Sequence, residues 1–395
     1  MKTRSAVLIC FLFLNAFALQ AGSFISRDGQ TITDSTGKVI QLKGVNLGGW
    51  LLWEGWIWGG SFTKESDIGK NLTTIAGKHE FDAFHKDVYQ NFINESDIKA
   101  ISELGFNVVR VPFNNRLFDS AYSQVNGWQL MDSLLHWCEK YHVYAILDMH
   151  AAVGGQSNFF IADPIKPNLW KSESGKQATV NLWMKIAGRY ADRKIIAGYD
   201  LLNEPIPSSK PDLVEMYDRI IKAIRAVDNN HMLVIEGANF AKDFSMFTRL
   251  PDNNMMFSFH IYTWLGGEPK DKMKQFADVR ERLDVPMWCG EWGENSYDVI
   301  QKTLDAFAAP DNKFSGWCFW TWKKHPNGYT SLNAINVSTS WKDVITWCHN
   351  PNMKKIPPHD AAVAAMIEFR KAMRYENCNH DFRLGEMLRK DASNK

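Results

Sequence analysis

The sequence predicts an α/β protein built as a closed (β/α)8 barrel, the TIM-barrel architecture. Between about residues 41 and 375, short apolar runs alternate with longer amphipathic stretches, and eight of the runs have the length of strands. The region contains no Gly/Ser-rich or Pro-rich linker, so we expect one domain. An open doubly wound sheet is the rival architecture. It usually has fewer strands and often a glycine-rich first turn, and no Gly-x-Gly-x-x-Gly motif follows the first expected strand.

The expected elements follow in order. Strands are expected at 41–47, 107–112, 144–149, 198–202, 232–236, 255–261, 286–290 and 314–321. Helices are expected at 96–104, 127–141, 175–190, 211–227, 270–283, 297–307 and 360–375, with a less regular helical pattern at 239–250. Ser96, followed by Asp97, is expected to cap the first of these helices.

Three connecting segments complete the expected fold. Residues 23–40 contain the turns Arg27-Asp28-Gly29 and Ser35-Thr36-Gly37, and we expect a hairpin there at the bottom of the barrel. Residues 50–95 after the first strand and 323–359 after the eighth exceed ordinary connections, and such long loops are usually functional. Both would lie at the carboxyl ends of the strands, where barrel enzymes have their active sites.

Residues 1–21 have the features of a secretory signal peptide. Lys2 and Arg4 precede an apolar run at 6–14, and small residues at 16–21 offer cleavage sites. The run is too short to span a membrane. We therefore expect export, to the medium or the periplasm, and a single domain over residues 22–395.

Five cysteines follow the expected signal peptide, and an odd number leaves at least one unpaired within the chain. Cys348 and Cys378 lie in the loop-rich C-terminal part and are the candidate pair. Cys289 and Cys318 lie in apolar runs and are expected to be buried thiols.

The composition limits the possible partners. Lys and Arg number 45 against 44 Asp and Glu, so the net charge of +1 argues against a nucleic-acid partner. The 16 tryptophans suit either a sugar-binding groove or a Trp-rich core. Composition alone leaves both interpretations open. We expect a monomer.

Polar and aromatic groups recur at the carboxyl ends of the expected strands. Alone, each has an ordinary structural explanation: a rim carboxylate, a hydrogen-bonding histidine or a packed tryptophan. Together they supply the parts for one reaction, because glycoside hydrolysis needs two carboxyl groups. Glu204 and Glu291 end the fourth and seventh strands, on opposite sides of the barrel mouth. The other groups are Arg110, His150, Asn203, His260, Tyr262, Trp320 and Trp322.

Six motifs in this order resemble the motif set of glycoside hydrolase family 5, over roughly residues 40–325. They are Val109-Arg110-Val111-Pro112, Leu147-Asp148-Met149-His150, Leu202-Asn203-Glu204-Pro205, His260-Ile261-Tyr262, Gly290-Glu291-Trp292-Gly293 and Phe319-Trp320-Thr321-Trp322. The Asn-Glu-Pro motif alone is moderately specific, and the ordered set is far more so. The resemblance makes residues 22–395 a single catalytic domain.

The resemblance implies hydrolysis of a β-glycosidic bond with retention of configuration. It makes Glu204 the general acid/base and Glu291 the nucleophile. The implied binding residues are Asn203 at the sugar 2-hydroxyl, Arg110 and Tyr262 on the nucleophile, His150 and His260 in sugar binding and the proton network, and Trp320 as the aromatic platform under the sugar, with Trp322 as its alternative. No cofactor and no metal are implied.

The run Gly44-Val45-Asn46-Leu47-Gly48-Gly49-Trp50 resembles the exo-β-1,3-glucanase branch of the family. The branch implies that Glu54 binds sugar hydroxyls and helps to wall the site, although a loop carboxylate without a ligand is as compatible with the sequence. The segments 148–152 and 154–156 also resemble bacterial cellulases.

We therefore expect a secreted enzyme that cleaves β-glucosidic bonds in oligo- or polysaccharides, of the glucan exo-β-1,3-glucosidase type. Within the family, the alternatives are an endo-β-1,4-glucanase and a β-glucosidase of lipid-linked glucosides. Outside it, a catalytically dead carbohydrate-binding barrel would be favoured by loss of either carboxylate, and both are present. A metal-dependent barrel enzyme lacks the expected His/Asp cluster in the sequence.

Overall fold

The computed structural model describes residues 24–34, 36–119, 125–264, 266–328, 330–352 and 355–393. The predicted signal peptide at 1–21 lies outside these residues. Among the helices described, none combines the length and the apolar character that crossing a membrane requires.

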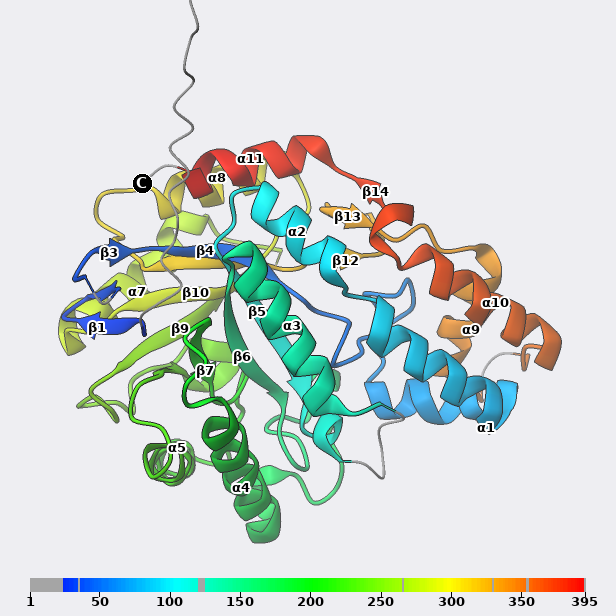
Figure 1. Ribbon diagram of the computed structural model, residues 1–395, viewed down its shortest axis with the longest axis horizontal. Coiled ribbons are helices and arrows are strands. Elements are labelled where there is room, and N and C mark those ends of the chain that lie inside the picture. Colours follow the sequence, from blue (N-terminus) through cyan, green and yellow to red (C-terminus); the bar gives the residue numbers. More distant parts are fainter. Residues whose placement is uncertain are drawn as a thin grey trace, which may run out of the picture.

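Eight parallel strands close into a barrel in chain order (Figure 1). They are β4 (Leu42–Asn46), β5 (Val108–Asn114), β6 (Tyr144–Ala151), β7 (Ile196–Asp200), β8 (Met232–Glu236), β9 (Met255–Ile261), β10 (Met287–Trp292) and β11 (Gly316–Phe319). Nearly every residue of these strands is buried, because helices cover the outside of the barrel and side chains fill its centre. The predicted barrel and all eight predicted strands are confirmed.

Helices connect the strands on the outer surface. They are α2 (Glu95–Glu103), α3 (Gly127–Tyr141), α4 (Glu173–Tyr190), α5 (Lys210–Arg225), α6 (Ala238–Ala241), α7 (Pro269–Leu283) and α8 (Tyr297–Phe307). Asn94 rather than Ser96 caps α2, in a capping box with Asp97. The predicted helix at 239–250 is wrong, because only the single turn α6 forms there. Phe244 and Phe247 cover the barrel instead. Both rings pack against Phe257 of β9, with centroid distances of 5.0 and 4.9 Å.

The predicted N-terminal hairpin is present as a three-stranded antiparallel sheet, β1 (Ser26–Asp28), β2 (Thr31–Thr33) and β3 (Val39–Ile40). The backbone N–H of Arg27 donates to Asn254, directly before β9, and the Arg27 side chain pairs with Asp284, shortly before β10. These contacts lie at the amino ends of the barrel strands, so the sheet covers the bottom of the barrel.

The two long connections form a lobe at one side of the barrel, where α1 (Glu65–Asn91), α9 (Thr339–His349) and α10 (His359–Ala372) pack together (Figure 1). We call residues 50–92 and 339–373 the side lobe. We expected loops over 50–95 and 323–359, and this expectation missed α1 and α9. Gly77 interrupts the regular backbone of α1 with a φ of 78°, which breaks the apolar periodicity that would have revealed a long helix.

The remaining elements follow or extend this lobe. A small sheet is formed by β12 (Lys323–Lys324), β13 (Asn333–Ala334) and β14 (Asn379–His380), and α11 (Phe382–Ser393) ends the described chain. In the described part of the chain, four short 3-10 turns lie between other elements, at Asn115–Phe118, Phe160–Ala162, Leu169–Lys171 and Tyr375–Asn377.

The cysteines and tryptophans are mostly core residues. All five cysteines in the described residues are buried free thiols, so the candidate pair of Cys348 and Cys378 is wrong and the burial of Cys289 and Cys318 is confirmed. The Cys378 thiol lies against the carbonyls of Ala372 and Arg374 at the end of α10 instead. Nine of the 16 tryptophans are less than 2% exposed. The Trp-rich composition therefore reflects the core more than a groove.

Candidate active site

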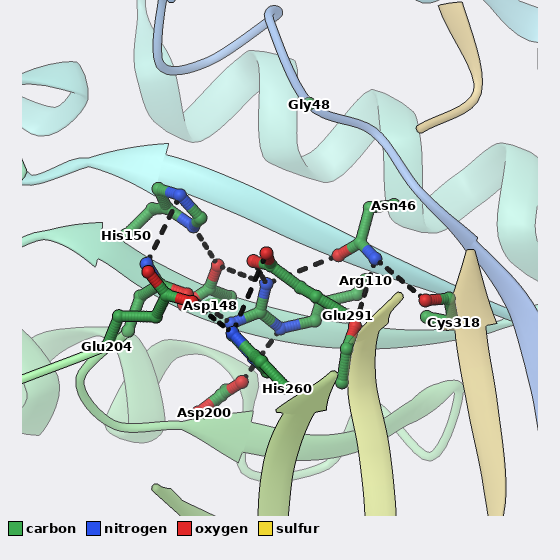
Figure 2. Close-up of polar contacts among 12 residues, drawn as sticks. Asn46, Gly48, Arg110, Asp148, His150, Asp200, Glu204, His260, Glu291 and Cys318 are labelled. Carbon is green, nitrogen blue, oxygen red and sulfur yellow. Dashed lines mark hydrogen bonds and ion pairs between the residues drawn. The ribbon is translucent and has the colours of Figure 1, made fainter. Parts of the chain in front are cut away.

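Arg110 is the centre of a buried polar cluster at the mouth of the barrel (Figure 2). It is the third residue of β5, and its side chain is fully buried. Its guanidinium forms ion pairs with the four carboxylates of Asp148, Asp200, Glu236 and Glu291 at 3.1, 2.8, 2.9 and 2.7 Å. A planar guanidinium with five donors suits such an arrangement. One cation thus orients acidic groups from four other strands.

Glu291 lies on β10, where the pairing register shifts between Cys289 and Glu291. The residue between them is Gly290, and a Cβ there would lie 2.3 Å from the Ser258 hydroxyl. Glycine therefore permits the irregularity that aims Glu291 into the mouth. The carboxylate accepts hydrogen bonds from Arg110 Nη1 at 2.7 Å and from Tyr262 Oη at 2.9 Å. Burial raises the pKa of Glu291. The negative charge of Glu204 raises it further, whereas the positive charges of His260 and Arg110 lower it.

Glu204 follows β7 in a left-handed backbone conformation, with a φ of 44°. Its backbone N–H donates to Glu236 Oε2 at 2.6 Å, and its Oε1 lies 2.8 Å from His260 Nδ1. The Glu204 side chain is 12% exposed and that of Glu291 is 6% exposed. Glu204 thus has the more open position of the two.

The two carboxyl groups lie close together. One oxygen of Glu204, one nitrogen of His260 and one oxygen of Glu291 all lie within 4.8 Å of one another. Three such ligand atoms could also surround a metal ion. However, Arg110 and Tyr262 already donate to the Glu291 oxygens, and Glu204 Oε1 is paired with His260. With a buried guanidinium also at 2.7 Å, the chemistry of the group fits acid–base work better than cation binding.

His150 and Asn203 form a second chain of contacts beside this pair. Asn203 Oδ1 accepts from Arg110, which fixes its amide so that Nδ2 faces His150 Nε2 at 3.3 Å. His150 Nδ1 lies 2.7 Å from Asp148 Oδ2. Burial lowers the pKa of His150 to about 4, so the ring is neutral, with its proton on Nδ1 and Nε2 accepting from Asn203. Burial also raises the pKa of Asp148 to about 8.

The two tryptophans after β11 have different positions. Trp320 stacks on His150 with ring centroids 5.5 Å apart and an angle of 16° between the planes. Trp322 is buried away from the mouth, where its indole N–H donates to Asp97 and its ring stacks on Tyr375. Trp320 is therefore the ring that belongs to the cluster, and Trp322 is a packing residue.

Glu54 lies in the loop after β4 and is only 2% exposed. Its Oε2 accepts from the indole N–H of Trp56 at 2.8 Å. Burial raises the pKa of Glu54 to about 8, and the charges of Glu291 and Glu204 contribute to this rise, which locates Glu54 near both of them. Glu54 is thus a buried carboxylate and not a solvated one.

A cavity of about 290 Å³ lies beside the cluster. Its lining includes Trp320 and Tyr262 together with Trp56, Phe62, Trp264, Gly293, Glu294, Asn295 and Lys324. Flat aromatic faces with a few polar groups are typical of pockets for small ligands, including sugars.

All the residues singled out from the sequence, except Trp322, lie at this mouth. Three buried members of the cluster were missed: Asn46, Asp200 and Glu236. Each is the last residue of its strand, β4, β7 or β8, so the strand-end rule used for the others would have found them. Gln156 was also missed as a cluster residue. It lies in a loop, donates to the carbonyls of His150 and Asn203, and offers no comparable signal in the sequence.

A (β/α)8 barrel with a buried pair of carboxyl groups at the carboxyl ends of its strands defines a class, the barrel glycosidases. The sequence comparison agrees. The family model "Cellulase (glycosyl hydrolase family 5)" matches residues 34–326. The chain belongs to glycosyl hydrolase family 5, and it is a glycoside hydrolase.

Curated relatives carry several different names. A beta-xylosidase of Phanerodontia chrysosporium is 27% identical over 341 residues, covering 76% of this chain and 71% of the relative. A probable glucan 1,3-beta-glucosidase A of Neosartorya fischeri is 28% identical over 350 residues, covering 71% and 82%. Endoglucanase C of Acetivibrio thermocellus is 26% identical over 226 residues, and that match covers 55% of this chain and 57% of the relative.

Solved structures show the same fold at low sequence identity. An endogalactoceramidase superposes with a TM-score of 0.59 at 17% identity, covering 87% of this chain and 84% of that one. A beta-glucanase from Saccharophagus degradans superposes with a TM-score of 0.54 at 18% identity, covering 89% and 93%.

Proposed function

We propose that the protein hydrolyses β-glucosidic bonds with retention of configuration, with Glu291 as nucleophile and Glu204 as general acid/base. The observation that carries this proposal is the carboxyl pair itself. A retaining enzyme holds its two carboxyl groups about 5–5.5 Å apart, whereas an inverting enzyme needs ~6.5–9.5 Å for a water molecule. One oxygen of Glu204 lies within 4.8 Å of one oxygen of Glu291, which supports the shorter separation.

The two roles follow from the unequal surroundings of the carboxyl groups. Glu291 accepts from Arg110 and Tyr262, and donors on both oxygens favour the carboxylate form that a nucleophile needs. Glu204 is the more open group, suited to reach a leaving oxygen. Proton transfer through a carboxyl group positioned in this way contributes roughly 10²- to 10⁴-fold to the rate.

The reaction then has two displacements. The Glu291 carboxylate attacks the anomeric carbon, the glycosidic C–O bond breaks, and the Glu204 proton goes to the leaving oxygen. In the second step Glu204, now a carboxylate, takes a proton from water as that water displaces Glu291 from the sugar. Asn203 Nδ2, fixed by Arg110, has a second N–H for the sugar 2-hydroxyl, where contacts strengthen in the transition state. Trp320 supplies the platform under the ring.

The substrate that we propose is a β-glucan, cleaved from a chain end in the manner of a glucan exo-β-1,3-glucosidase. Relatives named glucan 1,3-beta-glucosidase support this choice. The loop after β4 supports it too, because Glu54 and Trp56 occupy one side of the mouth and would stop a chain that extended past them. Glu54 would then hydrogen-bond the terminal sugar.

Two alternatives within the family rest on particular observations. An endoglucanase is favoured by the relatives of that name. A glucosidase of lipid-linked glucosides is favoured by the exposed rings at the cavity, where Phe62 is 63% and Trp264 50% exposed. Product analysis on β-1,3, β-1,4 and β-1,6 oligosaccharides and on alkyl glucosides separates the three. Early release of mono- or disaccharide supports the exo enzyme, whereas mixed long products support the endo enzyme.

We also propose that the protein is exported and acts as a monomer, without a nucleic-acid partner. The basic and apolar residues within 1–21 and the balanced charge support this. N-terminal sequencing of protein recovered outside the cytoplasm tests the cleavage, and a new terminus between residues 19 and 23 is expected.

The experiment that tests the catalytic roles is a pair of variants. Glu204→Ala should lower kcat by about 10²- to 10⁴-fold on substrates with poor leaving groups. On substrates with good leaving groups, azide should restore its activity, because a small anion can then attack the glycosyl-enzyme without a general base. Glu291→Gln should form no glycosyl-enzyme, because an amide does not attack as a carboxylate does. Rescue of Glu291→Ala instead of Glu204→Ala would reverse the assignment.

A further inference from the structure

We propose that Glu236, which belongs to none of the sequence motifs, is a positioning residue for the general acid: one carboxylate oxygen holds the backbone of Glu204, and the other pairs with the imidazole that touches Glu204. The inference rests on the proposed role of Glu204. It gives β8 a part in the reaction that the sequence analysis did not assign.

The first support is the position of the carboxylate. Glu236 is the last residue of β8, and its side chain is 0% exposed. Its Oε2 accepts from the backbone N–H of Glu204 at 2.6 Å, and its Oε1 accepts from Arg110 Nη2 at 2.9 Å. A buried carboxylate is costly unless its oxygens have partners, and here both oxygens have one.

The second support is the backbone of Glu204. Its φ of 44° lies in the left-handed region, which is unfavourable for an L residue other than glycine. The hydrogen bond from its N–H to the charged Glu236 carboxylate offsets that cost, because hydrogen bonds to charged groups are stronger than those between neutral groups. The direction of the Glu204 side chain depends on this backbone conformation, so Glu236 controls where the general acid points.

The third support is the imidazole of His260. Its Nδ1 lies 2.8 Å from Glu204 Oε1, and its Nε2 lies 3.1 Å from Glu236 Oε1 in an ion pair that is not aligned as a hydrogen bond. Burial lowers the pKa of His260, but the charges of Glu236 and Glu291 outweigh burial and raise it well above its usual value. The ring is therefore an imidazolium. A cation in this position stabilises the Glu204 carboxylate that forms when the proton leaves.

The groups around Glu236 decide where the negative charge resides. The cations beside its carboxylate are Arg110 of β5 and His260 of β9. The other groups that face Glu236 are Asp148 of β6, Asp200 of β7, Glu204 after β7, and Tyr217 of α5, which donates to its backbone carbonyl. Glu291 of β10 lies on the far side of Arg110 and His260. Burial raises the pKa of Asp148 to about 8 and that of Asp200 well above its usual value, whereas His260 and Arg110 lower that of Glu236 against the effect of burial. Glu236 is thus an ionised partner of both cations at neutral pH.

A purely structural role, as a counter-ion of Arg110, is the competing explanation. It predicts that loss of the Glu236 charge weakens the fold and affects every substrate alike. The positioning role predicts a change in the protonation of His260 and a loss confined to reactions that need the proton of Glu204.

The test uses Glu236→Gln, which removes the charge and retains the shape, with Asp97→Asn as the matched control. Asp97 is equally buried and pairs with Lys323, on the outside of the barrel at α2. In the full-length protein, ¹⁵N NMR follows the His260 ring through pH 6 to 8. The kinetic measurement compares kcat/KM for an alkyl β-glucoside, which has a poor leaving group, with kcat/KM for a dinitrophenyl β-glucoside, which has a good one.

The Gln variant should release the His260 proton within this pH range, whereas wild type and Asp97→Asn keep it. Its kcat/KM on the alkyl glucoside should fall about 10- to 100-fold, the scale of a misplaced catalytic group. Its kcat/KM on the dinitrophenyl glucoside should change little, because kcat/KM reports the first displacement, in which only a poor leaving group needs the Glu204 proton. A His260 that stays protonated, or equal losses on both substrates, would overturn the proposal.

Glu236→Asp covers the case in which the Gln variant does not fold. It keeps the charge and withdraws the carboxylate by one methylene, so His260 should stay protonated while activity on the alkyl glucoside falls. Wild-type activity of this variant on the alkyl glucoside would contradict the positioning role. Failure of the proposed function would give a different result, namely undiminished activity of Glu204→Ala on the alkyl glucoside. The two failures can be told apart because the NMR measurement on His260 does not depend on catalysis.

Discussion

The barrel mouth and the side lobe are held together by opposite kinds of interaction. At the mouth, one buried guanidinium binds four carboxylates, and hydrogen bonds set the position of each group. In the side lobe, the rings of Trp58, Phe84, Trp341 and Phe369 pack at centroid distances from 4.2 to 6.3 Å. Loss of a charge at the mouth should therefore alter chemistry, whereas loss of a ring in the lobe should alter stability.

The two regions meet in the loop after β4. Trp53 packs against Trp58 and Phe84 in the lobe, while its neighbour Glu54 lies near the catalytic pair. The packed rings of the lobe thus support the wall of the mouth, and the part of the lobe around Glu54 reaches the proposed binding site. This arrangement makes the boundary between chemistry and packing testable residue by residue.

The largest effect is expected at Arg110. Arg110→Met leaves four buried carboxyl groups without their shared cation, and breaking one buried pair by removal of a partner costs about 3–5 kcal/mol. We expect a large drop in the denaturant midpoint and loss of kcat on the order of 10⁴-fold or more, because Glu291 and Asn203 lose the donor that orients them. Near wild-type kcat in a folded Arg110→Met protein would show that the mouth is not organised by this cation.

The next effect tests the wall. Glu54→Ala should lower kcat/KM for an oligosaccharide by roughly 10- to 100-fold, since a hydrogen bond to a buried group is worth about 1–3 kcal/mol when its partner is left unpaired. Glu281→Ala, an exposed carboxylate near the barrel bottom, is the control and should change nothing. An unchanged kcat/KM for Glu54→Ala would remove Glu54 from the binding site.

The lobe should show the reverse pattern. Trp341 is fully buried, and its indole N–H donates to the carbonyl of Trp58 at 2.7 Å. Trp341→Ala should lower the free energy of unfolding by about 3–5 kcal/mol. On a dinitrophenyl glucoside at a temperature where the variant is folded, kcat should stay within about threefold of wild type. A larger loss of kcat would mean that the lobe takes part in the chemistry.

The smallest effect concerns the pH dependence of stability. Burial raises the pKa of Glu54 and of Asp148 to about 8, so folding favours their protonated forms and the free energy of unfolding should fall as pH rises toward 8. Below about pH 6.5 the depressed pKa of His150 acts in the opposite direction, so the variant is compared with wild type between pH 6.5 and 8. Glu54→Gln should reduce the slope there by at most ~1.4 kcal/mol per pH unit. A steeper slope in the variant would contradict the raised pKa.

The same contrast explains what could be predicted from the sequence. The barrel strands are visible because a strand buried on both faces reads as a continuous apolar run, as in β8 and β9. Glu204 and Glu291 are visible because they follow such runs. Glu236 also ends a run, but a lone glutamate there has too many ordinary explanations, and only its contacts with Glu204 and Arg110 distinguish it.

The side lobe was the least predictable part. Its helices bury their rings against each other rather than against the barrel. The spatial partners of Trp58, which are Trp341 and Phe369, are therefore 283 and 311 residues away in the chain. Local periodicity carries no information on such long-range packing. The interruption at Gly77 further hid the longest helix of the described chain.

The stereochemistry of hydrolysis tests the central claim most directly. ¹H NMR of the first product released from an aryl β-glucoside distinguishes the two anomers before they equilibrate. Double displacement through Glu291, with the carboxyl oxygens within 4.8 Å, predicts that the β-anomer appears first. Initial release of the α-anomer would mean direct attack by water and would contradict the assignment of Glu291 as nucleophile.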